Sequence, residues 1–328
     1  MRRVLFLTED REDYLADALL HGLIGCPDLE VVDHPRKQIL YRDGLPPAAA
    51  ATPGAAPIGV RGHGFTLYGL LEDRPVDRSF VIQRLERGAF DLVLIGQVWR
   101  QWGQLLDLAP WLQRVPVVLL DGDDDTRLFF RSGTRLRRYG WQPFPIRSRR
   151  CLYLKREWRG QGRSLRRPRL AEASFAIPAT KIRRADPAAK SQEFATHCVD
   201  PEVGEALGLP GRYAFASEEA YYADLARSRF AITTRRGGWD CLRHYEIAAA
   251  GAVPCFRNLE AKPAACAPHG LRAGINCLSY RHWAHLREQV DRLDPAAYAA
   301  LLESAQAWVG RHTTVAAARR LLDRVDRL

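Results

Sequence analysis

Short apolar runs alternate with amphipathic stretches along the first half of the chain. An unbroken apolar run of four to eight residues predicts a buried strand, and apolar residues three and four apart predict a helix. We expect strands at residues 4–7, 29–33, 90–96 and 115–120, helices at 12–23, 78–87 and 104–113, and further strand candidates at 151–154 and 174–177. Such alternation indicates a parallel sheet covered by helices on both faces.

The alternation fades between about residues 158 and 190, where Arg, Pro and Gly crowd the sequence, and it resumes over residues 194–280. The remainder has a helical pattern, in which Pro295 begins one helix and Thr313 caps the last. The predicted fold class is therefore α/β, with two doubly wound Rossmann-like domains and a C-terminal helical segment. The expected boundaries are 1–170, 171–300 and 301–328.

A strand–turn–helix–strand unit in the second domain is the most informative stretch of the chain. A β-prone run at residues 230–233 is broken by Gly237 and Gly238, and Asp240 is a favourable N-cap for a helix over 241–250. A second extended run follows the helix. The connection between two such parallel strands is right-handed, so this unit predicts a βαβ crossover.

Residues 234–240, at the carboxyl end of the first strand of this unit, are expected to face a ligand crevice. The helix start offers free N–H groups that suit a phosphate. Arg243 and Glu246 are three residues apart and share a helix face, where one can meet phosphate and the other can accept from ribose hydroxyls. Alternatively, they form an ordinary exposed ion pair beside an ordinary βα turn.

The same stretch resembles the donor-binding, carboxyl-terminal domain of GT-B glycosyltransferases, in particular the bacterial and exostosin-like groups. The resemblance covers about residues 215–260 and follows the pattern Gly-x-Asp-x-x-Arg-x-x-Glu-x-x-x-x-Gly-x-x-Pro. The matching residues are Gly238, Asp240, Arg243, Glu246, Gly251 and Pro254.

The resemblance implies a glycosyltransferase that moves a sugar from a nucleoside diphosphate sugar to a hydroxyl acceptor, whether glycan, lipid-linked or small. The first domain would then be the acceptor side, the second would bind the nucleotide sugar, and the C-terminal helices would pack back on the first. The expected donor-binding residues are Gly237, Gly238, Trp239, Asp240, Arg243 and Glu246. Retaining GT-B enzymes often carry a Glu eight residues before Glu246, where this chain has Gly238, and this difference favours inversion.

Inverting transfer needs one general base to take the acceptor proton. Three residues of the first domain are candidates, namely His63, Asp10 and Asp123. His63 lies between two glycines and has the pKa range of a base, but an ordinary loop residue is the commoner explanation. Asp10 is also placed to cap the following helix.

The acidic run at residues 121–125 invites a metal hypothesis, because hard cations prefer clustered carboxylates. GT-B enzymes generally hold the diphosphate without a metal, however, so we expect neither a cofactor nor a metal. Lys155 and Arg156 follow a predicted strand and could point into the cleft to neutralise the departing diphosphate. They could equally belong to an arginine-rich surface.

Composition limits the remaining classes of function. The 328 residues are 47% hydrophobic, carry seven cysteines without C-x-x-C spacing and have a formal net charge of +11. The first residues have the pattern of a strand rather than a secretory signal, and no apolar run is long enough to span a bilayer. We therefore expect a cytoplasmic protein, either free or peripheral on the anionic inner leaflet.

Arginines concentrate between residues 131 and 169, with Trp141, Tyr153 and Trp158 among them. A solvated, salt-bridged surface is the commonest explanation for such a cluster. An acidic acceptor or membrane, and then nucleic acid, are the alternatives. A basic nucleic-acid-binding module is thus the rival to a glycosyltransferase, whereas the missing G-x-G-x-x-G fingerprint argues against a dinucleotide-dependent epimerase.

Overall fold

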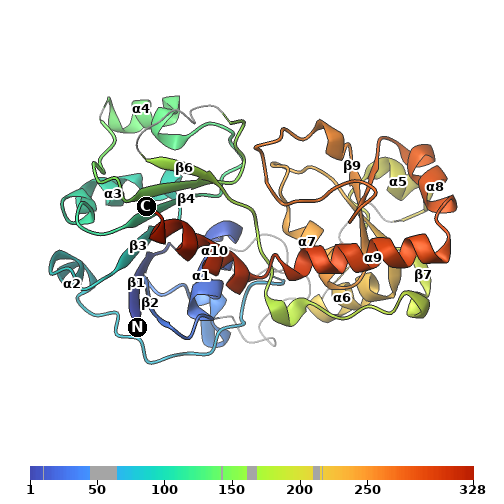
Figure 1. The fold of residues 1–328 in the computed structure, drawn as a ribbon, viewed down its shortest axis with the longest axis horizontal. Helices are drawn as coiled ribbons and strands as arrows, with labels where there is room; N and C mark the ends of the chain where they lie inside the picture. The colour runs from blue at the N-terminus through green and yellow to red at the C-terminus, as the bar shows by residue number, and fades with distance from the viewer. Residues whose placement is uncertain (10, 45–64, 142, 161–167, 210–214, 216) are drawn as a thin grey trace.

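The computed structural model describes residues 1–9, 11–44, 65–141, 143–160, 168–209, 215 and 217–328. Its named strands form two separate parallel sheets, one in each half of the molecule. The two halves lie side by side in Figure 1, with the C-terminal helices running across both. The predicted α/β class with two Rossmann-like sheets is confirmed.

The first sheet has the strand order β2–β1–β3–β4–β5–β6, and every neighbouring pair is parallel. Successive residues of β1 contribute to opposite core layers, since Val4 packs in one hydrophobic cluster and Leu5 in the other. Both faces of the sheet are therefore buried, as in other parallel sheets. The strands are β1 (Arg2–Leu7), β2 (Leu29–His34), β3 (Leu92–Ile95), β4 (Val117–Asp121), β5 (Cys151–Lys155) and β6 (Arg169–Glu172), and the helices are α1 (Tyr14–Ile24), α2 (Val81–Glu86), α3 (Val98–Leu112) and α4 (Gly133–Tyr139).

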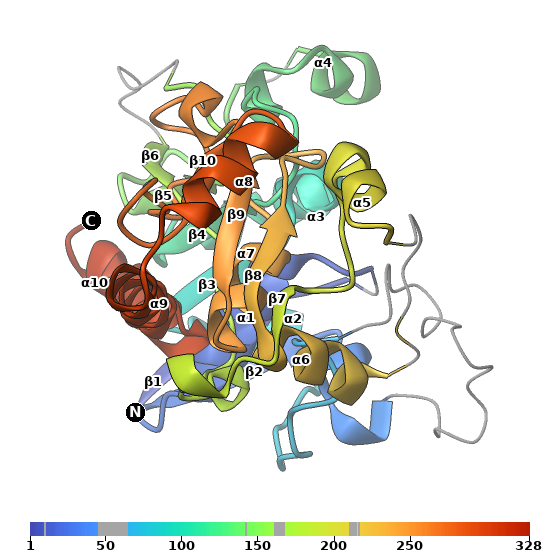
Figure 2. The same cartoon turned by 90° about the vertical axis from the view of Figure 1, so that its right-hand side faces the viewer.

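The second sheet has the order β10–β9–β8–β7 and is also parallel throughout. Figure 2, which turns this half toward the viewer, shows its strands with α6 and α7 beside them. The strands are β7 (Gln192–Phe194), β8 (Ser228–Thr233), β9 (Val253–Arg257) and β10 (Leu278–Tyr280), and the helices are α5 (Pro201–Ala206), α6 (Glu218–Arg227), α7 (Leu242–Ala249) and α8 (Trp283–Asp291).

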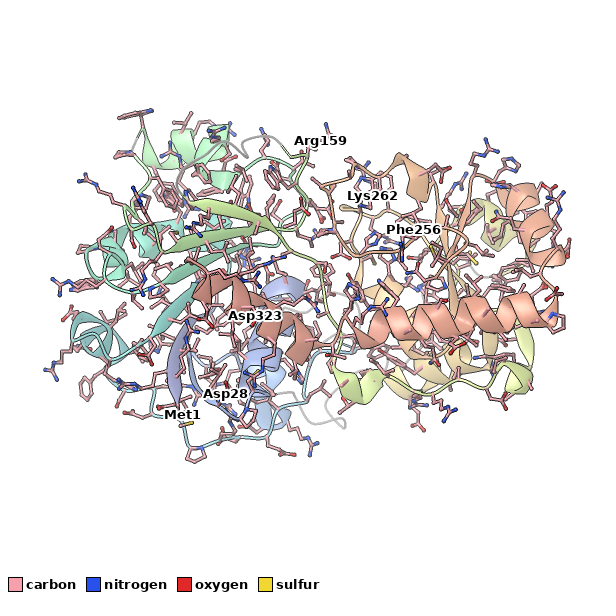
Figure 3. The ribbon with its side chains drawn as sticks, in the orientation of Figure 1. Met1, Asp28, Arg159, Phe256, Lys262 and Asp323 are labelled. Atoms are coloured by element: carbon pink, nitrogen blue, oxygen red, sulfur yellow. The ribbon has the colours of Figure 1, made fainter. Side chains whose placement is uncertain are left out.

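Two helices end the chain. Helix α9 (Pro295–Gly310) packs on the second half, and α10 (Thr314–Asp326) packs against α1 of the first. As predicted, α9 begins at Pro295 and Thr313 caps α10. Residue 301, where we expected the helical segment to begin, lies inside α9. Asp28, which pairs with Arg319 of α10, lies on the first half in Figure 3.

The contact between α1 and α10 is close because Gly22 lacks a side chain. A Cβ atom at Gly22 would lie closer than 3.0 Å to the carbonyl oxygen of Thr314. Next to it, His21 Nδ1 lies 3.0 Å from Thr314 Oγ1. Burial lowers the pKa of His21 to about 4, so this histidine is neutral near pH 7.

One predicted strand is wrong. Residues 174–177 form no strand, and the last strand of the first sheet is β6 instead. The backbone of this segment instead connects the halves of the molecule. The N–H of Phe175 donates to the carboxylate of Asp240 (2.7 Å), and Ile177 forms an isolated β-bridge with Thr313. No described helix is long and apolar enough to cross a membrane.

Candidate functional site

The loop between β8 and α7 is shaped by a histidine of the helix itself. The carbonyl of Trp239 accepts from Nε2–H of His244 (3.0 Å), so Nδ1 accepts from the Thr233 hydroxyl (2.8 Å). Burial lowers the pKa of His244 to about 4, which keeps the ring neutral for this arrangement. The middle of the loop, Arg235 to Gly237, stays exposed at the carboxyl end of β8.

Asp240 does not cap the helix, contrary to the sequence prediction. The N-cap position of α7 is Cys241, whose side chain makes no cap hydrogen bond. The buried carboxylate of Asp240 instead accepts from the backbone N–H of Phe175 (2.7 Å) and from the Tyr245 hydroxyl (3.0 Å). Its burial raises the pKa of Asp240 to about 6. Asp240 is thus a structural residue that attaches the chain between the sheets to α7.

The loop between β8 and α7 contains Gly237 and Gly238, and we call it the glycine loop. Its two glycines lie against acidic residues of the first half. A Cβ atom at Gly237 would come closer than 3.0 Å to the carboxylate of Asp124. At Gly238 it would come closer than 3.0 Å to the carboxylates of Glu157 and Asp124, and 2.6 Å from Arg156 Nη1. Glycine is therefore required at 238 by close packing. The position at which related enzymes often carry a glutamate has no room for one here.

Lys155 and Arg156 do not point into an open cleft, and this expectation is wrong. Both are buried, at 1% and 2% exposed. Lys155 Nζ pairs with Asp121 Oδ1 (2.7 Å) inside the first half. Because β5 ends at Lys155, the residues that follow it fill the junction between the halves.

Arg156 satisfies most of its donors at this junction. Its Nε donates to the carbonyl of Gly122 (3.0 Å), and Nη1 donates to Glu157 (2.5 Å) and to the carbonyl of Asp240 (3.0 Å). Nη2 pairs with Asp124. Glu157 in turn accepts from the Asp240 N–H (2.9 Å) and from the Cys266 thiol. Arg156 and Glu157 therefore connect the loop after β4, the loop before α7 and the segment that contains Cys266. Arg156 and Glu157 hold the glycine loop in place from the first half.

Arg243 and Glu246 share one face of α7, as their spacing predicts. The Arg243 guanidinium carbon lies 5.9 Å from the ring centroid of Tyr221, and the Tyr221 hydroxyl donates to Glu246 Oε2 (2.8 Å). Arg243 Nη2 lies 2.8 Å from His197 Nε2. Because the guanidinium is a donor only, this nitrogen of His197 accepts. Burial, and next the charge of Arg243, lower the pKa of His197 to about 3.

Glu246 also contacts the first half. The hydroxyl of Thr66 donates to its Oε1 (2.6 Å) and lies 2.9 Å from the Tyr222 hydroxyl, while the N–H of Thr66 donates to Glu218 (2.8 Å). Burial raises the pKa of Glu246. Each oxygen accepts one hydrogen bond from a described residue, and an ionised carboxylate has about four acceptor positions, so capacity for a ligand remains.

The acidic loop after β4 divides into buried and accessible aspartates. Asp121 is fully buried, and its carboxylate accepts from Trp99 Nε1 (2.9 Å), Tyr153 and Lys155. Burial raises the pKa of Asp121 to about 6. Asp123 is half-buried and accepts from the N–H of Asp125 (2.8 Å). Asp124, whose side chain is 54% exposed, is the one that lies against the glycine loop.

The other two candidates for the base, Asp10 and His63, lie outside the described residues. The capping role considered for Asp10 belongs to Asp13, whose side chain accepts from the N–H of Ala16 (3.0 Å) at the start of α1. Among the described residues, no group of three or more His, Cys, Asp and Glu is arranged to hold a metal ion.

Comparison with known proteins identifies the fold. No protein-family model and no curated protein sequence matches the chain. Solved structures do match it along its whole length. HepE of Anabaena with UDP-glucose has 12% identity, a TM-score of 0.54 and 100% coverage of both chains. A glycosyltransferase of Rickettsia africae has 9% identity, a TM-score of 0.55 and coverage of 99% and 98%. The chain has the GT-B fold.

A third GT-B structure, sucrose-phosphate synthase of Thermosynechococcus elongatus, has 8% identity, a TM-score of 0.51 and coverage of 100% and 99%. The GT-B resemblance that the sequence suggested is confirmed at the level of fold. At these identities the likeness concerns the fold alone, so the site must be argued from the residues of this chain.

Three residues of the site were missed from the sequence, namely His197, Asp124 and Thr66. A signal existed for His197, because it follows β7 as the glycine loop follows β8, and carboxyl ends of parallel strands meet at one edge. Asp124 was part of the acidic run, but nothing in that run distinguishes it from Asp123. The sequence assigns no role to Thr66 itself, since its partners are 152 and 180 residues away.

Proposed function

We propose that this protein is a glycosyltransferase that moves a sugar from a nucleoside diphosphate sugar to a hydroxyl acceptor. The observation that carries the proposal is the placement of Arg243 and Glu246 on one face of α7, both in contact with Tyr221, after a loop at the carboxyl end of β8 whose residues 235–237 are exposed. Structures of the similar HepE hold UDP and UDP-glucose, so UDP-sugars are the first donors to test.

In this proposal Arg243 and the backbone N–H groups of residues 237–239 bind the diphosphate, since both are donors suited to an anion. His197 accepts from Arg243 and fixes its orientation. Glu246 uses its remaining acceptor positions for the ribose hydroxyls. Trp239 stacks on Phe256, with ring centroids 6.2 Å apart, and this contact supports the loop between β8 and α7.

We place the general base in the first half, on Asp123 or Asp124, because their loop lies opposite the glycine loop. The base removes the acceptor proton, the acceptor oxygen bonds to the anomeric carbon from the face opposite the leaving group, and the diphosphate departs with the electron pair. Arg243 then stabilises the negative charge that develops on the leaving group. Gly238 provides no second carboxylate on the donor side, so we propose inversion without a metal.

The test is a transfer assay with a panel of nucleoside diphosphate sugars and simple hydroxyl acceptors, with and without EDTA. We expect turnover with one donor class, an inverted anomeric configuration by proton NMR, and no loss with EDTA. Arg243→Gln and Glu246→Gln should each abolish most turnover, while Arg87→Gln, on an exposed arginine whose side chain pairs with no described residue, should not. Full activity in both site variants, with the fold intact, would refute the proposal.

A further inference from the structure

Helix α4 and its flanks carry a set of positive charges that nothing in the described chain neutralises. Residues 126–150 contain eight arginines and no Asp or Glu. Arg131, Arg137 and Arg138 are exposed, and none of the three makes a side-chain hydrogen bond or ion pair with a described residue. A salt-bridged surface, the commonest explanation for such a run, does not apply to these three arginines.

Other exposed arginines, such as Arg87 and Arg184, also make no side-chain hydrogen bond or ion pair with a described residue, so the lack of a partner does not by itself distinguish this segment. Half-buried arginines are paired: Arg287 pairs with Glu193 (2.5 Å) and Asp291 (2.6 Å), and Arg257 pairs with Asp200 (2.7 Å). The α4 segment differs in its sequence, because its eight arginines have no Asp or Glu among them over residues 126–150.

Two large apolar side chains are exposed among these arginines. Trp141 is 83% exposed and Leu136 is 44% exposed. The helix buries its other side, where Arg135 lies over the ring of Trp102 and Ser132 caps the first turn. By helical periodicity, Arg137 points away from the buried side, with Leu136 and Arg138 on either flank. We call Arg131, Leu136, Arg137, Arg138 and Trp141 the α4 face.

The α4 face rests on a packed aromatic cluster. The ring of Phe130 lies 5.5 Å from Phe144 and 5.4 Å from Tyr153, and Trp102 lies 5.2 Å from Phe129. Tyr153, which the sequence had placed in an aromatic and basic surface, is buried in this cluster, and Trp158 is buried as well. Figure 1 shows α4 at the outer edge of the first half. The exposed side chains therefore project from a fixed support.

We propose that the α4 face docks the protein on a lipid bilayer with anionic headgroups. Arginines near such a surface gain from its negative potential, and a tryptophan is favoured at the boundary between headgroups and acyl chains. Burying an aliphatic side chain such as Leu136 at that boundary adds to the binding free energy. The same side chain makes no favourable contact with the phosphate backbone of a nucleic acid in water. This combination favours a bilayer over nucleic acid, and it does not depend on the proposed catalytic site.

The test is sedimentation of the full chain with vesicles of phosphatidylcholine alone or with 30% phosphatidylserine, at about 0.1 M salt. We expect binding to the phosphatidylserine vesicles only. Arg137→Gln/Arg138→Gln should lower the partition coefficient roughly 25-fold, at roughly fivefold per arginine. Trp141→Ala should lower it roughly tenfold. Arg87→Gln/Arg184→Gln removes two exposed arginines elsewhere whose side chains pair with no described residue, and it should change the partition coefficient less than about threefold.

Three outcomes would overturn the proposal. One is equal binding of the wild-type protein to both kinds of vesicle. Another is an equal loss in the control pair, which would mean that net charge alone acts. The third is absence of vesicle binding together with tight oligonucleotide binding that depends on Arg137 and Arg138. Circular dichroism of each variant separates these results from unfolding, since all the substituted side chains are exposed.

Discussion

The two glycines of the loop before α7 should differ sharply in their tolerance of a methyl group. In Gly238→Ala, the new Cβ meets Glu157 and Arg156, which are both buried and hydrogen-bonded to each other. Overpacking of this kind costs about 1–3 kcal/mol, and loss of a buried hydrogen bond adds about 1 kcal/mol or more. We expect Gly238→Ala to reduce the free energy of unfolding by roughly 2–4 kcal/mol.

In Gly237→Ala, by contrast, the new Cβ meets only Asp124, whose side chain is 54% exposed and can turn into solvent. The cost is an ion pair with one exposed partner, about 1 kcal/mol or less. Asp124→Ala should remove the obstacle, so the double variant Gly237→Ala/Asp124→Ala should be no less stable than Asp124→Ala alone. The same second substitution should not rescue Gly238→Ala, because Glu157 and Arg156 remain.

Equilibrium urea unfolding of the wild type and these variants measures the difference. The reasoning would be refuted if Gly238→Ala were within about 0.5 kcal/mol of the wild type, the range of ordinary surface substitutions. It would also fail if Gly237→Ala were the more destabilised of the two. Either result would mean that the flanking residues of the first half do not press against the glycine loop as described.

Three further outcomes follow from the contacts of the terminal helices and the acidic loop. The pKa of His21 is lower in the folded than in the unfolded protein, so neutral His21 stabilises the fold above pH 6.5. This stabilisation, up to about 3 kcal/mol, is lost as the pH falls toward 4. Urea unfolding over this pH range should therefore show a smaller loss of stability in His21→Asn than in the wild type. Gly22→Ala should destabilise by about 1–3 kcal/mol through contact with Thr314, whereas Gly310→Ala, with open space around it, should leave the thermal midpoint unchanged or slightly higher. Manganese added to the EDTA-treated protein should not raise its melting temperature, and a specific, saturable rise would contradict the metal-free proposal.

The local parts of the fold were predictable from sequence because their determinants are close together in the chain. The run Phe230–Thr233, the glycine break and Gly251 after the helix determine β8 and α7 within some twenty residues. The spacing of Arg243 and Glu246 placed both on one helix face for the same reason. These features depend on backbone preference and periodicity, which a single sequence carries.

The roles of the junction residues could not be predicted, because their partners are far away in sequence. Asp240 has the residue type and position of an N-cap, yet its carboxylate binds a backbone N–H 65 residues away. Arg156 follows a strand end, where a cleft residue is expected, but it is buried against Asp124 and the carbonyl of Asp240. Only the packing of the two halves decides whether such a charge faces a ligand or fills an interface.

The most direct test of the central claim, that α7 binds a nucleoside diphosphate, is isothermal titration of the protein with UDP, GDP, dTDP, CDP and ADP. We expect one of them to bind and Arg243→Gln to weaken that binding by about 10-fold to 100-fold, as loss of a charge-assisted hydrogen bond would. Arg87→Gln should leave it unchanged. If no nucleotide binds, or if Arg243→Gln binds as tightly as the wild type, the claim is contradicted.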